Sequence, residues 1–404
     1  MQNAIAFILC GGQGERLHPL TKDRAKPAVP FGGIYRIIDF TLSNCLNSGL
    51  KRLFLLSQYK SFALEKHVYA GWNVLAPGGG EFIHLLPPQQ RMKDDWYLGT
   101  ADAVFQNFYS LRAYSPDYVF VLSGDHVYKM DYRKMLRYHR RHKADVTIGM
   151  YQVPIEQAVR FGVIEVDDTS RIVGFYEKPK TPIPMPHDRK RALVSMGVYL
   201  FDTQALAGAL MADAEDERSE HDFGRNVIPK MIPGYRVLGY EFDDENRGSE
   251  PYWRDVGTIE DYYEANMDLV QVSPKFNLYD ERWPIHTLQP QLPCAKTVWN
   301  DVKAGRVGQV LQSLVAQGCI VSGGKVERSL RSPQVRVNSF AEVSDSILLD
   351  GVTVGRRARL RRAIVDKRVQ IPDGYRIGFD AESDRRRFKV TESGIVVIPK
   401  EQTL

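Results

Sequence analysis

The sequence is poor in cysteine and contains no long apolar run. Its 404 residues include only four cysteines, at positions 10, 45, 294 and 319, and none belongs to a C-x-x-C pair. This excludes a zinc ribbon or a redox motif of that type, and it favours a reducing cytoplasm. No segment approaches the roughly 20 apolar residues of a membrane helix. The first apolar segment, residues 4–10, lacks a preceding basic region and ends in glycines, so it is a poor signal peptide.

The sequence also lacks a strong charge of either sign. Its formal net charge is +5, which suits small anionic ligands and does not require nucleic acid. Two arginine-rich segments, 356–362 and 385–389, lack interleaved aromatics and a recognisable binding module. We therefore expect neither a nucleic-acid nor a membrane partner. At this length we expect two or three domains.

The first two-thirds of the chain alternates strand-like and helix-like segments. Buried strands are expected at 4–10, 52–58 and 117–125, and helices at 100–114 and 132–143. This alternation predicts an α/β, Rossmann-like domain with a mostly parallel sheet. In such sheets ligands bind beyond the carboxyl ends of the strands. The segments that follow the first and third strands are therefore candidate binding loops.

The pattern changes after a proline- and aromatic-rich stretch at 272–300. Beyond about residue 305, aliphatic residues recur at six-residue intervals, as in the sets Leu348, Val354, Leu360 and Val352, Ala358, Ile364. A six-residue period is typical of a parallel β-helix, which we take to be left-handed, and favours it over an antiparallel sandwich with chance spacing. Such coils often mediate subunit contacts.

A glycine-rich loop follows the first strand. Gly11, Gly12 and Gly14 fall within four positions, so backbone N–H groups there can approach phosphate oxygens. A dinucleotide fingerprint would need a third glycine where Leu17 stands, and no P-loop string occurs in the chain. The loop is therefore neither of these two common phosphate sites.

Two basic residues accompany this loop. Arg16 lies two positions after Gly14 and can supply a guanidinium fork, and Lys26 adds a further charge. Together they suit a triphosphate, placed where the charge of a leaving group develops. The alternative is a tight turn with surface charges, but the position directly after a buried strand favours the phosphate site.

The string that contains this loop resembles the signature of the sugar-nucleotide pyrophosphorylases. The stretch "DRAKPAVPFGGIYRIIDFTLSNCLNSG" is similar to one branch, the bacterial ADP-glucose pyrophosphorylases (glucose-1-phosphate adenylyltransferases). The likeness continues in "WYLGTADAV", "LSGDHVYKMDY", "FGVIEVD", "YEKP", "VSMGVYLF", "HDFGRNVIPK" and "EPYWRDVGT". It implies a nucleotidyltransferase domain at 1–275, a connector at 276–304 and an oligomerisation or regulatory β-helix at 305–404.

The resemblance implies the reaction of ATP with α-D-glucose 1-phosphate to give ADP-glucose and pyrophosphate, for glycogen synthesis. A sugar phosphate is already mostly dianionic at neutral pH, so no general base is required. The reaction needs neutralisation and alignment of two polyanions by a divalent metal, lysine and arginine. The absence of an evident nucleophile–base pair in the sequence agrees with this interpretation.

The resemblance also assigns roles to individual residues. Asp125 and Asp255 would hold Mg²⁺, with Arg16 and Lys26 completing the catalytic set. The expected ATP-binding residues are Gly11, Gly12, Gly14, Gln89 and Gly99, the last two near adenine. The expected glucose 1-phosphate residues are Tyr97, Gly162, Glu177, Lys178 and Ser195. For His126 we prefer a supporting hydrogen-bonding role, because the scattered histidines do not form a zinc pattern.

The resemblance further implies a homotetramer controlled by metabolites. Arg36 and Arg386 are candidate effector residues, although each could equally decorate a solvated basic surface. One branch of the family, activated by sugar bisphosphates, has lysine directly after "FGG", where this chain has Ile34. We therefore expect a different effector, or weak binding of fructose 1,6-bisphosphate.

Three other functions remain as alternatives. The chain could be a pyrophosphorylase for another nucleotide or sugar, which would differ at positions such as Gln89, Gly99 and Glu177. It could be a regulatory subunit of a mixed tetramer, but then some of the five charged site residues should be missing. An added acyltransferase activity is disfavoured, because the β-helix is short and has no evident catalytic histidine.

Overall fold

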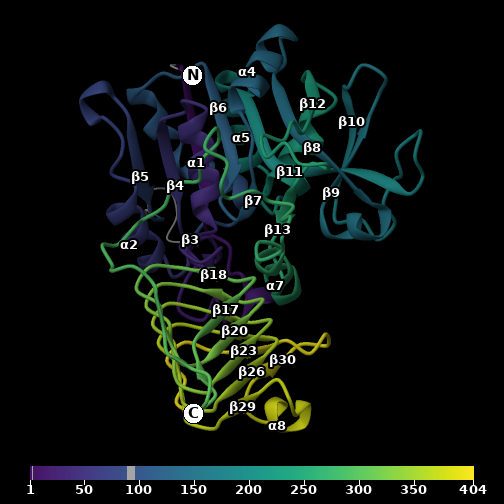
Figure 1. Ribbon diagram of the computed structural model, residues 1–404. Coiled ribbons are helices and arrows are strands. Elements are labelled where there is room, and N and C mark those ends of the chain that lie inside the picture. The colour runs from purple at the N-terminus through teal and green to yellow at the C-terminus, as the bar shows by residue number, and fades with distance from the viewer. Residues whose placement is uncertain (2, 89–95) are drawn as a thin grey trace.

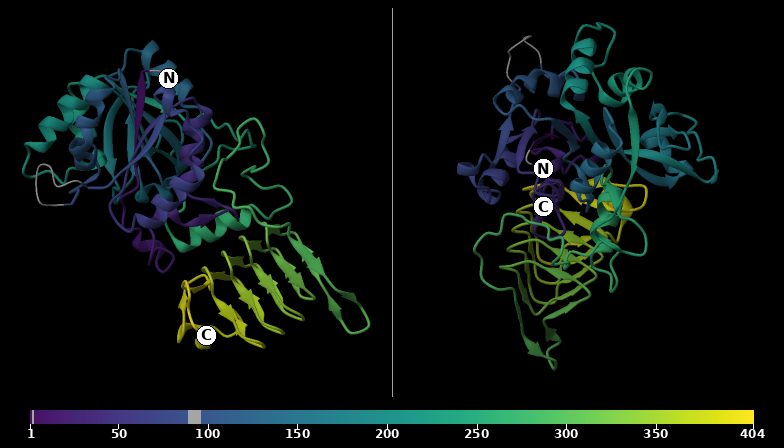
Figure 2. Two further views of the ribbon diagram at one scale, coloured as in Figure 1. Left: turned by 90° about the vertical axis from the view of Figure 1, so that its left-hand side faces the viewer. Right: turned by 90° about the horizontal axis from the view of Figure 1, so that it is seen from above.

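The computed structural model describes residues 1, 3–88 and 96–404, which form an α/β domain above a coiled β-domain (Figures 1 and 2). The α/β domain is built on one mixed sheet, in which β8 pairs with β11 and β12 beside the path β10-β9-β11-β6-β1-β4-β5. Its strands are β1 (Ala4–Leu9), β4 (Arg52–Leu56), β5 (Phe82–Leu86), β6 (Tyr118–Ser123), β8 (Val146–Pro154), β9 (Gly162–Val166), β10 (Ile172–Glu177), β11 (Arg191–Asp202) and β12 (Val237–Glu241).

The half of this sheet formed by β6, β1, β4 and β5 is parallel, the pairing that the sequence predicts for most of the sheet. Strand β1 pairs in parallel with both β4 and β6, and β4 with β5. Strand β11 runs antiparallel to β6 and begins the mixed half of the sheet. Because alternate residues of a strand point to opposite faces, Ala6 and Ile8 enter one hydrophobic cluster while Ile5 and Phe7 enter the other. The near-continuous apolar run of β1 therefore reflects burial on both faces.

Helices cover both faces of the sheet. Residues of α1 (Ile38–Asn47), α2 (Phe62–Gly71) and α4 (Tyr132–Arg141) belong to one cluster. Those of α3 (Thr100–Asn107), α5 (Thr203–Ala214) and α6 (Ile228–Met231) belong to the other. The helix expected at 100–114 is α-helical only to Asn107, and a 3₁₀ segment, Phe108–Ala113, completes it. The α/β domain expected from the alternating pattern, with helices packed on the sheet, is confirmed.

A two-stranded ribbon and one helix connect the sheet to the lower domain. Strand β7 (His126–Tyr128) pairs antiparallel with β13 (Trp253–Asp255), and Asp255 lies opposite His126. Helix α7 (Ile259–Asp268) follows β13 and lies directly above the coiled domain (Figure 1). A short hairpin of β2 (Pro30–Phe31) and β3 (Tyr35–Arg36) lies on the same side. The chain then crosses an irregular connector.

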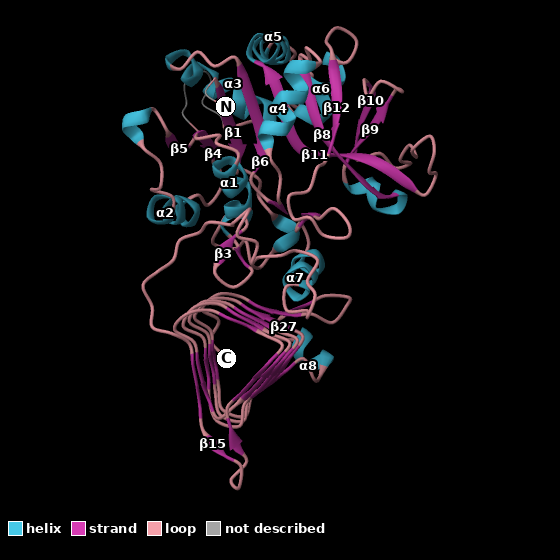
Figure 3. Cartoon of the chain, turned by 45° about the horizontal axis from the view of Figure 1, so that its top comes forward, coloured by secondary structure: helices cyan, strands magenta, loops and turns pink. Residues whose placement is uncertain are grey.

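The coiled domain is a triangular prism of three sheets (Figure 3). One sheet contains β14 (Lys296–Val298), β19 (Ile320–Ser322), β22 (Arg336–Val337), β25 (Thr353–Val354) and β28 (Gln370–Ile371). The second contains β17 (Gln309–Leu311), β20 (Lys325–Glu327), β23 (Glu342–Ser344), β26 (Arg359–Arg361) and β29 (Arg376–Ile377). The third contains β18 (Leu314–Val315), β21 (Leu330–Arg331), β24 (Ile347–Leu348), β27 (Ala363–Val365), β31 (Val396–Ile398) and β30 (Lys389–Val390).

Neighbouring coils of the prism are related by parallel pairing. Val343 pairs with Leu360 and Leu360 with Ile377, so one coil takes 17 residues at this edge. The six-residue period therefore predicted a parallel β-helix correctly. One member of the period behaves differently, because Ile364 packs against the α/β domain and not inside the prism. A hairpin of β15 (Asn300–Asp301) and β16 (Arg306–Val307) extends from the first coil, and α8 (Ala381–Arg385) follows β29 (Figure 3).

The two domains share a hydrophobic cluster. Leu330, Ile347 and Ile364 of the prism lie in one cluster with Phe40 and Tyr262 of the α/β domain. A buried ion pair reinforces the contact, because both carboxylate oxygens of Asp366 accept from Nη2 of Arg24, at 2.9 and 2.8 Å. The prism is thus packed against the α/β domain along one of its sheets.

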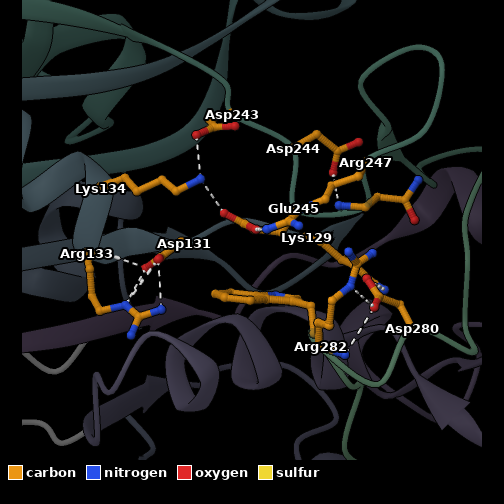
Figure 4. Close-up of polar contacts among 12 residues, drawn as sticks. Lys129, Asp131, Arg133, Lys134, Asp243, Asp244, Glu245, Arg247, Asp280 and Arg282 are labelled. Carbon is orange, nitrogen blue, oxygen red and sulfur yellow. Dashed lines mark hydrogen bonds and ion pairs between the residues drawn. The ribbon is translucent and has the colours of Figure 1, made fainter.

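An ionic cluster fixes the connector to the α/β domain (Figure 4). Lys129, directly after β7, is buried; its Nζ donates to the carbonyl of Asn277 at 2.8 Å and lies 3.8 Å from Asp280. Glu245 forms ion pairs with Lys134 and Arg247. The cluster therefore joins β7, the segment before β13 and the connector.

In the described part of the chain, no helix has the length and apolar character needed to cross a membrane.

A buried histidine of α4 predicts a pH dependence of stability. His139 is 1% exposed, and burial lowers its pKa to about 4. The unfolded chain takes up this proton near pH 6.5 while the folded chain does not, so the free energy of unfolding falls as the pH falls below 6.5. We expect a loss of about 2 kcal/mol from this group between pH 7 and pH 4.5.

Urea denaturation of the wild type and of His139→Phe across this pH range measures the effect. The variant loses the hydrogen bond between His139 Nδ1 and Thr147 Oγ1, so it starts less stable. Its stability should then decline less on acidification than that of the wild type. Parallel curves for the two proteins would contradict the prediction.

Candidate active site

The glycine loop lies beyond the carboxyl end of β1. Gly14 adopts a left-handed conformation with φ +64°, and a Cβ there would lie 3.0 Å from the side chain of Thr21. Gly12, in contrast, faces open space, with no atom within 4 Å of an added Cβ. Gly14 is therefore required by the turn itself, whereas Gly12 leaves the loop backbone accessible to a ligand.

A buried lysine joins the two predicted metal aspartates. Lys26 Nζ lies 2.8 Å from Asp125 Oδ2 and 2.7 Å from Asp255 Oδ1. Burial lowers the pKa of Lys26, but attraction to the two carboxylates outweighs it and leaves the pKa above its ordinary value. Burial likewise opposes ionisation of Asp125 and Asp255, yet Lys26 holds the pKa of each carboxyl below its usual range. All three groups are therefore charged at neutral pH.

His126 stands beside the same carboxylates. Its Nδ1 lies 3.1 Å from the carbonyl oxygen of Met196, so Nδ1 carries the hydrogen and donates it there. Nε2 then faces the carboxylates, 3.5 Å from Asp125 and 3.9 Å from Asp255. Asp125, His126 and Asp255 each offer one atom that could bind a metal ion, and these three atoms lie within 4.8 Å of one another. Among the described residues, no other group of three or more His, Cys, Asp or Glu side chains does so. His126 therefore lies beside both carboxylates, and its supporting role remains a prediction.

Arg16 approaches Asp255 from the solvent side. Its Nη2 lies 3.8 Å from Asp255 Oδ2, and its side chain is 57% exposed. A Cβ at Gly257 would lie 2.9 Å from this nitrogen, so the glycine after β13 makes room for the guanidinium. The structure therefore gathers Arg16 and Lys26 around both aspartates and leaves Arg16 free to reach a ligand.

A second group of predicted residues surrounds Glu177 at the end of β10. Its carboxylate lies 2.7 Å from Lys178 Nζ, and Lys178 has a strained left-handed φ of +46°. An added Cβ would lie 3.0 Å from Glu177 Oε2 at Gly162 and 2.7 Å from it at Gly224. The two glycines therefore leave space for this carboxylate. Sequence reasoning missed Gly224, although the segment "HDFG" that contains it was noticed.

Ser195 and Tyr199 connect the two groups. Ser195 Oγ accepts from the backbone N–H of Gly197 at 3.2 Å and donates to Tyr199 Oη at 3.3 Å. Tyr199 stacks on Phe223, which directly precedes the glycine beside Glu177. Met196, next to Ser195, holds the His126 ring. A continuous series of contacts thus runs from the aspartates to Glu177.

Two predicted nucleotide or sugar residues have other partners among the described residues. The hydroxyl of Tyr97 accepts from Asn107 Nδ2 at 2.8 Å and is buried. A Cβ at Gly99 would lie 2.4 Å or less from the carbonyls of Glu220 and His221. Packing against that loop therefore accounts for the glycine without a ligand. Gln89 lies outside the described residues, and the ligand roles of all three remain predictions.

The candidate effector arginines occupy different surroundings. Arg36 is partly buried between the domains, 3.7 Å from Asp350, and Asp350 also lies 3.3 Å from Lys367. Arg386, directly after α8, is 80% exposed, and its ion pair among the described residues is with Glu382 of that helix. The structure therefore supplies Lys367 rather than Arg386 as the basic neighbour of Arg36.

Comparisons with known proteins show the family of the chain. The family model described as nucleotidyl transferase matches residues 5–272, and a model described as GlmU-like, C-terminal hexapeptide matches residues 293–398. The chain is 52% identical to a glucose-1-phosphate adenylyltransferase of Koribacter versatilis, with all of this chain and 97% of the relative aligned. It is also 52% identical to one of Rhodopirellula baltica, over all of this chain and 91% of that relative. An Anaeromyxobacter protein of the same name is 49% identical over 99% of this chain and 98% of its own. The chain therefore belongs to the glucose-1-phosphate adenylyltransferase family of nucleotidyl transferases.

Proposed function

We propose that this enzyme joins ATP and α-D-glucose 1-phosphate to form ADP-glucose and pyrophosphate, and that the product supplies glycogen or a related α-glucan. The observation that carries the proposal is the convergence of Asp125, Asp255 and Lys26 beyond the sheet, next to the glycine loop. The relatives named for this activity, similar over the whole chain, support it.

The reaction asks little of the protein in proton transfer. The phosphate of the sugar has a second pKa near 6, so its oxygen is a ready nucleophile at neutral pH. Arg16 and Lys26 neutralise the charge that develops on the departing pyrophosphate, which is the principal demand of phosphoryl chemistry. Lys178 binds the sugar phosphate and Glu177 accepts hydrogen bonds from sugar hydroxyls. The roles are thus alignment and charge neutralisation.

The chemistry of the site fits Mg²⁺. Two carboxylates that face one ammonium group can equally face a divalent cation, and Mg²⁺ usually takes only one or two protein carboxylates. Asp125 and Asp255 would hold it. When bound, Mg²⁺ neutralises phosphate charge and favours the in-line arrangement of the reacting groups. Because Lys26 contacts both carboxylates, the cation and this ammonium compete for the same oxygens.

A pyrophosphate-release assay tests the reaction and its metal carboxylate together. With Mg²⁺, ATP and glucose 1-phosphate should give the highest turnover in a panel that includes UTP, dTTP and other sugar phosphates. Asp125→Asn should reduce that turnover on the order of a thousandfold, because a metal carboxylate is lost. Asp167→Asn, in an exposed turn, serves as the control. Preference for another substrate pair, or near-normal activity of Asp125→Asn, would refute the proposal.

The competition at Lys26 predicts a gain of metal affinity on mutation. Without nucleotide, Lys26→Met should bind Mn²⁺ about tenfold more tightly than the wild type, because the bridging charge is removed. Electron paramagnetic resonance of free Mn²⁺ measures this, with exposed Lys22→Met as the control. Unchanged affinity in Lys26→Met would contradict the competition. Absence of Mn²⁺ binding in every protein would contradict the metal site itself.

We also propose metabolite control and assembly as a homotetramer in the cytoplasm. Arg36 and Lys367, at the contact between the domains, offer positive charge to an anionic effector. Exposed apolar side chains in the connector region and first coil support subunit contacts; they include Val272, Tyr279, Val302 and Leu311. The four unpaired cysteines agree with a reducing compartment.

Ile34 leads to a prediction about the effector. Fructose 1,6-bisphosphate should activate the wild type weakly, because Ile34 offers neither charge nor a hydrogen-bonding side chain beside Arg36. Ile34→Lys should respond at lower bisphosphate concentrations, and Ile34→Met should behave like the wild type. Activity titrations measure this. Strong activation of the wild type at micromolar concentrations would overturn the prediction.

A further inference from the structure

One arginine side chain is directed into the β-helix. Arg331 lies in β21, where it pairs with Leu348 of the next coil, and Leu348 in turn pairs with Val365. Leu348 and Val365 are both members of the hydrophobic cluster inside the prism. Since paired residues of neighbouring coils point the same way, the guanidinium of Arg331 shares the interior with these side chains. Arg331 is fully buried, with 0% exposure.

This guanidinium has no partner among the described residues. Nε, Nη1 and Nη2 are all buried without a hydrogen bond. The nearby sulfur is that of Cys319, which donates to the carbonyl of Ser332 at 3.1 Å. Burial raises the pKa of this thiol, so Cys319 remains neutral and does not supply the missing negative charge.

Arg331 cannot escape the cost of a buried, unpaired charge by losing its proton. Burial lowers the pKa of Arg331, but a guanidinium starts from so high a value that it remains charged at physiological pH. A buried lysine or histidine could become neutral, whereas a buried arginine requires an opposite charge nearby. Water molecules can accept hydrogen bonds from the guanidinium, but they leave its charge uncompensated.

We propose that Arg331 holds a small monovalent inorganic anion, such as chloride, inside the first coils of the β-helix. The side chains stacked with Arg331 are those of Val315 and Leu348, which are apolar and offer no hydrogen bond to the additional oxygens of a phosphorylated metabolite. Access comes from the end of the prism. The residue paired with Arg331 in the first coil is Val315, which is 39% exposed, so a single coil separates the guanidinium from solvent.

Bromide is the probe, because it replaces chloride and is identified by its anomalous scattering. Crystals of the full chain grown in sodium bromide without chloride should show an anomalous peak within hydrogen-bonding distance of the Arg331 guanidinium. The same protein should unfold several degrees higher in bromide than in sodium gluconate of equal ionic strength, because gluconate is too bulky to enter. Absence of the bromide peak would overturn the proposal.

Two matched variants separate this site from general salt effects. Arg331→Met keeps an unbranched side chain and removes the charge, so it should lose the difference between bromide and gluconate. Arg336→Met makes the same change at an outward-facing, exposed arginine of the next coil and should keep the wild-type difference. An equal bromide response in all three proteins would show that Arg331 is not the site. If Arg331→Met does not fold, the crystallographic result on the wild type decides alone.

Discussion

The site depends on a single ammonium group between two carboxylates. Asp125 and Asp255 approach closely enough that both contact Lys26 Nζ, and two such carboxylates would not both stay ionised without a nearby cation. The surrounding elements are arranged around this requirement. Strand β6 delivers Asp125, the β7–β13 ribbon delivers Asp255, and the glycine loop turns back so that Lys26 enters between them.

The same ribbon extends to the rest of the molecule. One end of β7 is next to Asp125, and the other leads into Lys129, whose ammonium is fixed to the connector. Helix α7 follows Asp255 directly, and Tyr263 of this helix donates to the carbonyl of Asp345 in the prism at 2.6 Å. A displacement of the prism would therefore act on α7, the helix that follows the strand carrying Asp255. The effector that we propose to bind between the domains would thus have a physical route to the site.

Local patterns in the sequence predicted the parts of the structure that depend on neighbouring residues. The buried runs of β1, β4 and β6 and the six-residue period of the prism were evident, because burial on both faces or inside a coil leaves a regular signal. The meeting of Asp125 with Asp255 came only from the family resemblance, because β7 and β13 are far apart in the chain. The contact of His126 with Met196 and the space that Gly224 leaves for Glu177 depend on long-range packing. No local pattern in the sequence predicts these two contacts.

Two residues have surroundings that the sequence pattern did not reveal. Gly99 is predicted to lie near adenine, and independently of any ligand the carbonyls of Glu220 and His221 occupy the space of its absent side chain. Ile364 fits the period of the interior but faces the other domain. Periodicity identifies buried positions without telling which of two apolar surroundings receives them.

The repeating construction of the prism has an evolutionary consequence. Each coil pairs with its neighbours through equivalent residues, such as Leu330 with Ile347 and Ile347 with Ile364. These three side chains point out of the prism and pack against the α/β domain. A whole coil gained or lost outside the coils that contain these residues would preserve the pairing of the remaining coils. Evolution can therefore change the length of the β-helix by whole coils and create new surfaces at its ends, while the chemistry of the α/β domain stays the same.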